Sequence, residues 1–262
     1  MKKTIIALMA LAGVAAAGTT SPTVVAFGNS DTSALKEAHP FITDAFYVHG
    51  TSNPSITLSN GDVISFSTEG ATYAGGTDGS VEKTWSNSAA ITEMNAALGL
   101  TSGFTGADFS EGSDIYYTAT GNSGSKSSIT LTLNSANVGD TITLFVTAAS
   151  RAQHTAGFSI TGLAADSITL SYAGLNGNGF TAASGNSVNY SADLAGNWSP
   201  NTESVMIFKV TGVLESTSLT MVQGGTAKNG WQTLSYVVVP EPTTATLSLL
   251  ALAGLAARRR RK

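Results

Sequence analysis

The chain has 262 residues, no cysteine and 11% charged residues, against roughly 25% in an ordinary soluble domain. The absence of thiols excludes disulfides and thiolate metal sites. The low charge, together with 28 glycines, excludes a coiled coil and a highly charged disordered chain.

The amino-terminal segment has the pattern of a secretory signal peptide. Lys2 and Lys3 precede an apolar run over residues 5–17, which is too short to span a bilayer but matches the charged and apolar regions of such a signal. Small or β-branched residues allow cleavage after Ala17 or after Ala26, and the pattern does not choose between them. Residues 1–26 are therefore predicted to be a signal peptide.

Residues 27–236 show the alternation of apolar and polar side chains that is typical of half-buried strands. Two runs at 55–58 and 63–68 flank an Asn-Gly turn and predict a tight hairpin. Two further runs at 128–134 and 141–147 predict a second hairpin, with a longer loop over residues 135–140.

Further segments carry strand or helix signals. Strands are expected at 45–49, 114–120, 157–161, 167–172, 187–192, 204–213, 218–222 and 232–239. A single helix is expected over 88–98, because Ile91, Met94 and Leu98 share one face. Ser86, Asn87 and Ser88 are candidate caps for its start, and Gly99 can end it.

Short strands at regular spacing with one helix predict an all-β protein. We expect a single antiparallel β-sandwich, jelly-roll-like, with one short helix and no internal domain boundary. A right-handed β-helix is the rival architecture, but no constant-period repeat supports it.

Catalytic motifs are sparse in this sequence. It contains no nucleophile-elbow serine motif, no zinc-protease motif and no phosphate-binding glycine loop. Triad partners need not be close in the chain, so a hydrolase would need a spatial triad, such as a serine with His154 and Asp166. We expect a non-catalytic protein, with a secreted hydrolase as an alternative.

Acidic side chains in one loop are weak candidates for a calcium site. Calcium binds carboxylate and carbonyl oxygens, and Asp108, Glu111 and Asp114 are close in the chain. Asp also stabilises turns through its own side chain, and this interpretation is the simpler one. The sequence therefore predicts no bound cofactor, with calcium left as an alternative.

One exposed tryptophan is a candidate for sugar stacking. Trp198 lies in an Asn-Trp-Ser-Pro loop, where its ring face would suit a pyranose. Trp231, directly before a valine-rich strand, is expected to be buried in the core. A carbohydrate-binding or adhesin module is thus a second functional hypothesis.

The carboxyl-terminal residues 237–262 form a three-part segment. Pro240, Glu241 and Pro242 make an extended stretch, because proline fixes its own φ and restricts the preceding residue. Residues 243–257 are uncharged and leucine-rich and predict a short transmembrane helix of roughly 22 Å. The cluster Arg258, Arg259, Arg260, Arg261 and Lys262 keeps the end cytoplasmic by the positive-inside rule.

This segment resembles the PEP-CTERM sorting signal of Gram-negative and related bacteria. The resemblance implies that an exosortase, a membrane-embedded cysteine-protease-like enzyme, recognises Pro240, Glu241 and Pro242 and cleaves near them. It also implies a signal peptidase as the other processing enzyme and an inner-membrane intermediate. The destination would be the cell-envelope surface or the exterior, often in species that make exopolysaccharide or biofilm.

Charge restricts the partners of the exported body. Between residues 27 and 239 there are six basic and sixteen acidic side chains, a net charge of −10 with histidine neutral. Nucleic acid and anionic lipid are therefore poor direct partners. We expect an exported cell-surface or matrix protein, with exopolysaccharide as a further candidate partner.

Overall fold

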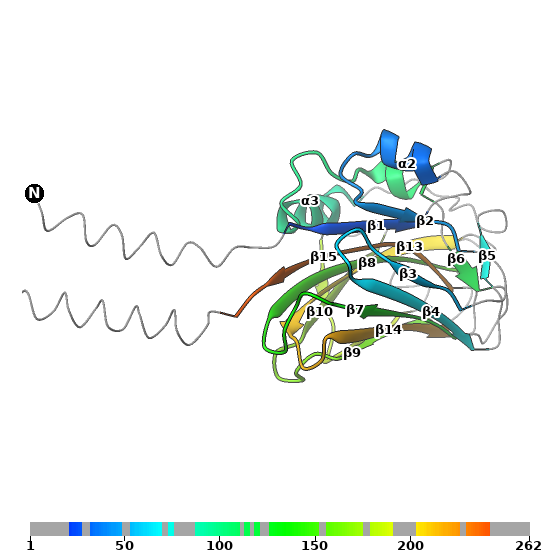
Figure 1. Cartoon of the computed structure of the whole chain (residues 1–262). Helices are drawn as coiled ribbons and strands as arrows, with labels where there is room; N and C mark the ends of the chain where they lie inside the picture. Colours follow the sequence, from blue (N-terminus) through cyan, green and yellow to red (C-terminus); the bar gives the residue numbers. More distant parts are fainter. Residues whose placement is uncertain are drawn as a thin grey trace, which may run out of the picture.

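The computed structural model describes residues 21–27, 32–48, 53–69, 73–75, 87–110, 113–115, 118–120, 126–151, 156–174, 179–190, 203–225 and 229–241. Within these residues the strands form two sheets that face each other (Figure 1). The larger sheet has nine strands and the smaller sheet has six. The predicted sandwich of short strands is confirmed.

The larger sheet has the order β11-β10-β13-β8-β15-β1-β2, with β6 pairing β15 and β5 pairing β6. Its strands are β1 (Thr23–Phe27), β2 (Asp44–Phe46), β5 (Tyr73–Gly75), β6 (Thr118–Thr120), β8 (Thr141–Arg151), β10 (Thr169–Gly174), β11 (Thr181–Ala182), β13 (Glu203–Val213) and β15 (Asn229–Val239). β1 pairs β2 in parallel. The sequence predicts an antiparallel sandwich, so this parallel pair is a correction to that prediction.

The smaller sheet has the order β12-β9-β14-β7-β4-β3. Its strands are β3 (Ser55–Thr57), β4 (Val63–Glu69), β7 (Lys126–Thr132), β9 (Ala156–Thr161), β12 (Ser187–Tyr190) and β14 (Ser218–Gly225). The predicted β3–β4 hairpin is confirmed, with Gly61 at φ +88° in its turn. A positive φ is the conformation that glycine adopts without strain.

The second predicted hairpin is wrong. β7 lies in the smaller sheet and β8 in the larger one, so residues 133–140 cross from one sheet to the other. The chain returns to the smaller sheet between β8 and β9. It passes from the larger sheet to the smaller one between β13 and β14, and back again between β14 and β15. Crossings of this kind connect the two sheets of a β-sandwich. Alternation predicts the face that each side chain takes, but not the strand that becomes the partner.

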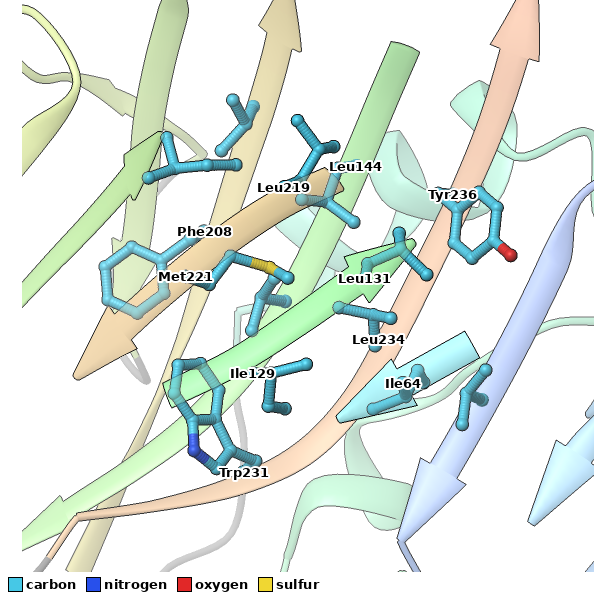
Figure 2. Close-up of a cluster of buried hydrophobic side chains, with 14 of the residues drawn as sticks. Ile64, Ile129, Leu131, Leu144, Phe208, Leu219, Met221, Trp231, Leu234 and Tyr236 are labelled. Atoms are coloured by element: carbon cyan, nitrogen blue, oxygen red, sulfur yellow. The ribbon is translucent and has the colours of Figure 1, made fainter. Parts of the chain in front are cut away.

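The main core fills the space between the sheets (Figure 2). Trp231 and Leu234 of β15 face Ile129 of β7 across this space, and Phe158 stacks on Phe208 with ring centroids 4.1 Å apart. Trp231 is fully buried, as expected, and its indole N–H donates to the Ser127 hydroxyl at 3.0 Å.

A second core covers the outer face of the larger sheet. Two α-helices, α2 (Thr32–Ala38) and α3 (Ser88–Ala97), and a short 3-10 helix, η1 (Gly106–Phe109), are described there. They pack against side chains such as Phe145 and Ile207 of the larger sheet. The predicted helix corresponds to α3, with Asn87 accepting from the Ala90 N–H at 3.1 Å and Gly99 at φ +68° after its end.

The expectation of a single helix is corrected by α2. This helix has seven residues and buries only Leu35, so it carries no repeating apolar stripe that a pattern search could detect. None of the described helices combines the length and the apolar character needed to cross a bilayer. The helix predicted at 243–257 and most of the predicted signal peptide lie outside the described residues.

The sandwich extends beyond the predicted limits of 27 and 236. β1 begins at Thr23 and β15 ends at Val239. Val24, Val25 and Ala26 of β1 are fully buried. Their strand pairs β15 on one side and β2 on the other, so these residues belong to the folded body.

Candidate functional site

β15 carries the folded body directly into the predicted sorting motif. It pairs β8 as far as Val239, which lies opposite Thr141. Its register with β1 on the other side ends earlier, at Tyr236 opposite Thr23. The last three residues of β15 are thus held in the ladder by β8, and Pro240 follows without an N–H of its own.

Glu241 rests on a turn at the start of β8. Its N–H donates to Oδ1 of Asp140 at 3.0 Å, and Oδ2 of the same carboxylate accepts the Asn137 N–H at 2.8 Å. Gly139 has φ +100°, and a Cβ placed there would lie 2.8 Å from Oε2 of Glu241. Gly139 and Asp140, called the Gly139–Asp140 seat below, therefore bind the backbone of Glu241 and leave room for its side chain.

A pocket of about 370 Å³ opens beside this seat. Its described lining is Ser21, Pro22, Thr23, Thr43, Ser59, Asn60, Asp62, Leu133, Ser135, Ala136, Asp140, Tyr236, Val238 and Pro240. The lining contains hydroxyls, an amide and two carboxylates and, among these residues, no lysine or arginine. It combines residues that precede β1 with residues that end β15, so the two ends of the described chain meet there.

The buried polar groups of the pocket bind one another. The Tyr236 hydroxyl donates to Oδ2 of Asp62 at 2.5 Å, and the Asn60 amide donates to the same oxygen at 2.9 Å. Oδ1 of Asp62 accepts the Asn134 N–H at 2.8 Å. Asp62 is only 2% exposed, and these bonds compensate the cost of burying its charge.

Tyr236 is held in its neutral form. Burial, followed by the hydrogen bond to the Asp62 carboxylate, raises the pKa of the Tyr236 phenol well above its usual value. A phenol that stays protonated at neutral pH is not a general base there. The network joins the β3–β4 turn to β15 and serves the fold.

The calcium candidates are placed separately. Asp108 accepts the Thr105 N–H at 2.6 Å and the Thr105 hydroxyl at 3.0 Å, and it faces Nδ1 of His39 at 3.5 Å. Asp114 is exposed, and Glu111 lies outside the described residues. Among the described residues, no group of three or more His, Asp or Glu side chains is arranged to hold a metal ion.

Several other predicted site residues also fall outside the described part of the chain. These are Trp198, His154, Pro242 and the cluster Arg258 to Lys262. Sugar stacking by Trp198 and a triad with His154 therefore stay predictions. Asp166, the third member of that triad, lies exposed in the turn before β10.

Sequence reasoning missed the Gly139–Asp140 seat. The sequence predicts a hairpin loop over residues 135–140, which gives Gly139 and Asp140 a role in the turn alone. Asp140 and Glu241 are 101 residues apart in the chain. Nothing local in the sequence indicates that they meet, because only the pairing of β8 with β15 brings them together.

The fold and the junction define a β-sandwich body that ends in a sorting segment. Residues 238–262 match the family model described as the PEP-CTERM protein-sorting motif. The chain therefore carries this motif at its carboxyl end, and the motif indicates a surface protein sorted by an exosortase. No curated protein matches the sequence.

Solved structures give only distant likenesses. One titled "CBM4 structure and function" is 15% identical with a TM-score of 0.23, covering 48% of this chain and 70% of that one. TmCBM61 with β-1,4-galactotriose is 10% identical with a TM-score of 0.23, covering 48% and 72%. The CBM22-1–GH10 modules of Clostridium thermocellum xylanase 10B with xylohexaose are 12% identical with a TM-score of 0.29, covering 75% and 29%. Scores this low carry no argument about fold or ligand.

Proposed function

We propose that this protein is an exported, non-catalytic component of the cell surface or extracellular matrix, released from the inner membrane by an exosortase. The observation that carries the proposal is the match of residues 238–262 to the sorting motif. In this proposal the chain is the substrate of the peptidase, and its sandwich is the cargo.

The distribution of charge supports the orientation. The basic cluster Arg258 to Lys262 follows an uncharged run, and such clusters remain on the cytoplasmic side. The body carries sixteen acidic and six basic side chains between residues 27 and 239. Its net negative charge gives solubility outside the cell and disfavours adsorption to anionic lipid.

The placement of the two chain ends supports the same arrangement. Thr23 and Tyr236 are register partners on adjacent strands, so the chain enters and leaves the larger sheet at one end (Figure 1). A body attached at one end can fold while the sorting segment is still in the membrane. The same end then faces both proposed processing enzymes, signal peptidase and exosortase.

The test replaces Pro240, Glu241 and Pro242 by alanine in the full chain, expressed in a host that contains an exosortase. We expect the variant to stay uncleaved in the inner membrane, while the parent chain is found at the surface or in the medium. Replacing Thr243 and Thr244 by alanine is the matched control and should leave processing unchanged. Mass spectrometry of the mature carboxyl terminus gives the cleaved bond, and an unaltered mass in the motif variant would refute the proposal.

A further inference from the structure

We propose that the folded sandwich holds Glu241 of its own sorting motif on the Gly139–Asp140 seat, so that the exosortase cleaves only after the end of β15 has left the sheet. The inference rests on the proposed function and deepens it, because it assigns to the body a control over its own release.

The backbone N–H of Glu241 is already hydrogen-bonded within the folded body. Enzymes and domains that bind extended peptides do so through main-chain hydrogen bonds. Pro240 has no N–H to offer, so the Glu241 N–H is the first donor after β15. Asp140 accepts that hydrogen bond at 3.0 Å, which makes the donor unavailable to a peptidase cleft.

The folded body also restricts access to the start of the motif. Val239 is paired with Thr141 in the ladder directly before Pro240, and Pro240 is partly buried where it lines the pocket. Oε2 of Glu241 occupies the space beside Gly139 that a Cβ there would approach to 2.8 Å. A cleft that must surround the peptide on both sides of Pro240 cannot close while Val239 is still paired with β8.

Only a short part of β15 needs to open to free the motif. Val237, Val238 and Val239 are paired to β8, beyond the last residue that pairs β1. The preceding residue, Tyr236, is 3% exposed and is bonded to Asp62. Opening can therefore stop at Tyr236, and a short strand end that is held on one side opens at far lower cost than the whole domain.

The expected cleavage rates follow from two states of the body. In the closed state the end of β15 is paired with β8, and in the open state it has left the sheet. When only the open fraction can bind, the apparent affinity of the enzyme falls in proportion to that fraction. Substitutions that weaken the seat should raise the cleavage rate, and a covalent lock on β15 should lower it. If the exosortase instead binds the motif while β15 is still paired with β8, neither effect is expected.

The lock exploits the absence of native cysteine. Thr141→Cys with Val239→Cys places two thiols on register partners of β8 and β15, and opposite residues in antiparallel strands have the Cα separation that a disulfide requires. In the full chain, we expect pulse-chase labelling to show cleavage at least about tenfold slower for the oxidised double variant, and restored by a dithiol. Each single-cysteine variant and the dithiol-treated parent chain are the controls.

Two independent variants test whether freeing the motif from the Gly139–Asp140 seat accelerates cleavage. Asp140→Ala removes the acceptor of the Glu241 N–H, and a Gly-Ser-Gly-Ser insertion between Val239 and Pro240 keeps the seat but frees the motif. A hydrogen bond to a charged group contributes enough to shift the open fraction about tenfold, so cleavage should accelerate by up to that factor. Asp114→Ala, at an exposed carboxylate elsewhere, should leave the rate unchanged.

The outcomes separate this inference from the proposed function. The inference is wrong if the oxidised double-cysteine variant is cleaved at the parent rate, or if the insertion does not accelerate cleavage. Either result would mean that the exosortase binds the motif while β15 is still paired. The insertion keeps the inference falsifiable even if Asp140→Ala fails to fold, which its melting temperature would show. If the alanine variant of Pro240 to Pro242 is cleaved like the parent chain, the proposed function itself fails.

Discussion

The hydroxyl of Tyr236 donates to the carboxylate of Asp62 across 2.5 Å, joining residues 174 apart in the chain. Tyr236 is on β15 and Asp62 closes the β3–β4 turn, so this bond links the larger sheet to the smaller one. The Asn60 amide donates to both partners, at 3.1 Å to the phenol and 2.9 Å to the carboxylate. The end of the sandwich from which the sorting motif leaves is therefore fixed by a buried polar network.

Removing this hydroxyl should destabilise the body. Tyr236→Phe leaves the buried Asp62 carboxylate without one of its donors, at a cost of roughly 1–3 kcal/mol in the free energy of unfolding. Urea denaturation of the mature chain measures the change. Tyr172→Phe, at a partly exposed tyrosine of β10, is the control and should change stability much less. Equal effects of the two substitutions would show that the Asp62 bond adds little.

The same network predicts alkaline sensitivity. Burial and the Asp62 carboxylate raise the pKa of Tyr236 in the folded state, so the folded state favours the neutral phenol. Its stabilising contribution is complete below about pH 10, the ordinary pKa of tyrosine, and is lost as pH rises toward the folded-state value. Denaturation midpoints measured across this range should fall for the parent chain and fall less steeply for Tyr236→Phe. Parallel curves would contradict the prediction.

The position of β1 predicts the amino terminus of the mature protein. Cleavage after Ala26 would remove four of the five residues of β1, including the fully buried Val24, Val25 and Ala26. Burial of each valine contributes about 1.5–3 kcal/mol, so the truncated body should lose cooperative unfolding. We expect the mature chain to begin at Gly18, after the alternative site at Ala17.

Intact mass and amino-terminal sequencing of the secreted protein measure this directly. Two recombinant bodies, one beginning at Gly18 and one at Phe27, provide the matched comparison by thermal denaturation. A secreted protein that begins at Phe27 and melts cooperatively would show that β1 is dispensable.

Asp108 is expected to act in the fold without calcium. Its carboxylate accepts two hydrogen bonds from Thr105 at the start of η1, so Asp108→Ala should cost about 1 kcal/mol, as for the loss of a helix cap. Adding calcium or a chelator should leave the melting temperature of the parent chain unchanged. A calcium-dependent rise in melting temperature that disappears in Asp108→Ala would establish the metal site instead.

Sugar binding is tested at Trp198. A surface or matrix protein without a glycan site should give no specific signal on a glycan array or in a polysaccharide pull-down. The mature chain and its Trp198→Ala variant are compared, with Trp231 left intact because it belongs to the core. A signal that depends on Trp198 would favour the carbohydrate-binding hypothesis.

The sequence by itself determined the positions of most strands, the helix α3 and the sorting segment. Each of these is a local signal. Alternation predicts which side chains of a strand such as β7 point inward. Asn87 and Gly99 mark the two ends of α3. The three parts of the sorting segment are contiguous in the chain. Physical properties that depend on neighbours in the chain can be recognised without knowing the fold.

Only the tertiary structure decided which strands pair and what lies above the larger sheet. Backbone hydrogen bonds are the same for every partner strand, so the sequence does not distinguish a β7–β8 pair from other pairings. In the structure the two strands lie in different sheets. Phe145 is buried on the outer face because α3 and its neighbours cover it. The Asp140–Glu241 contact depends on that pairing as well, since two residues so far apart in the chain meet only when β8 and β15 lie side by side.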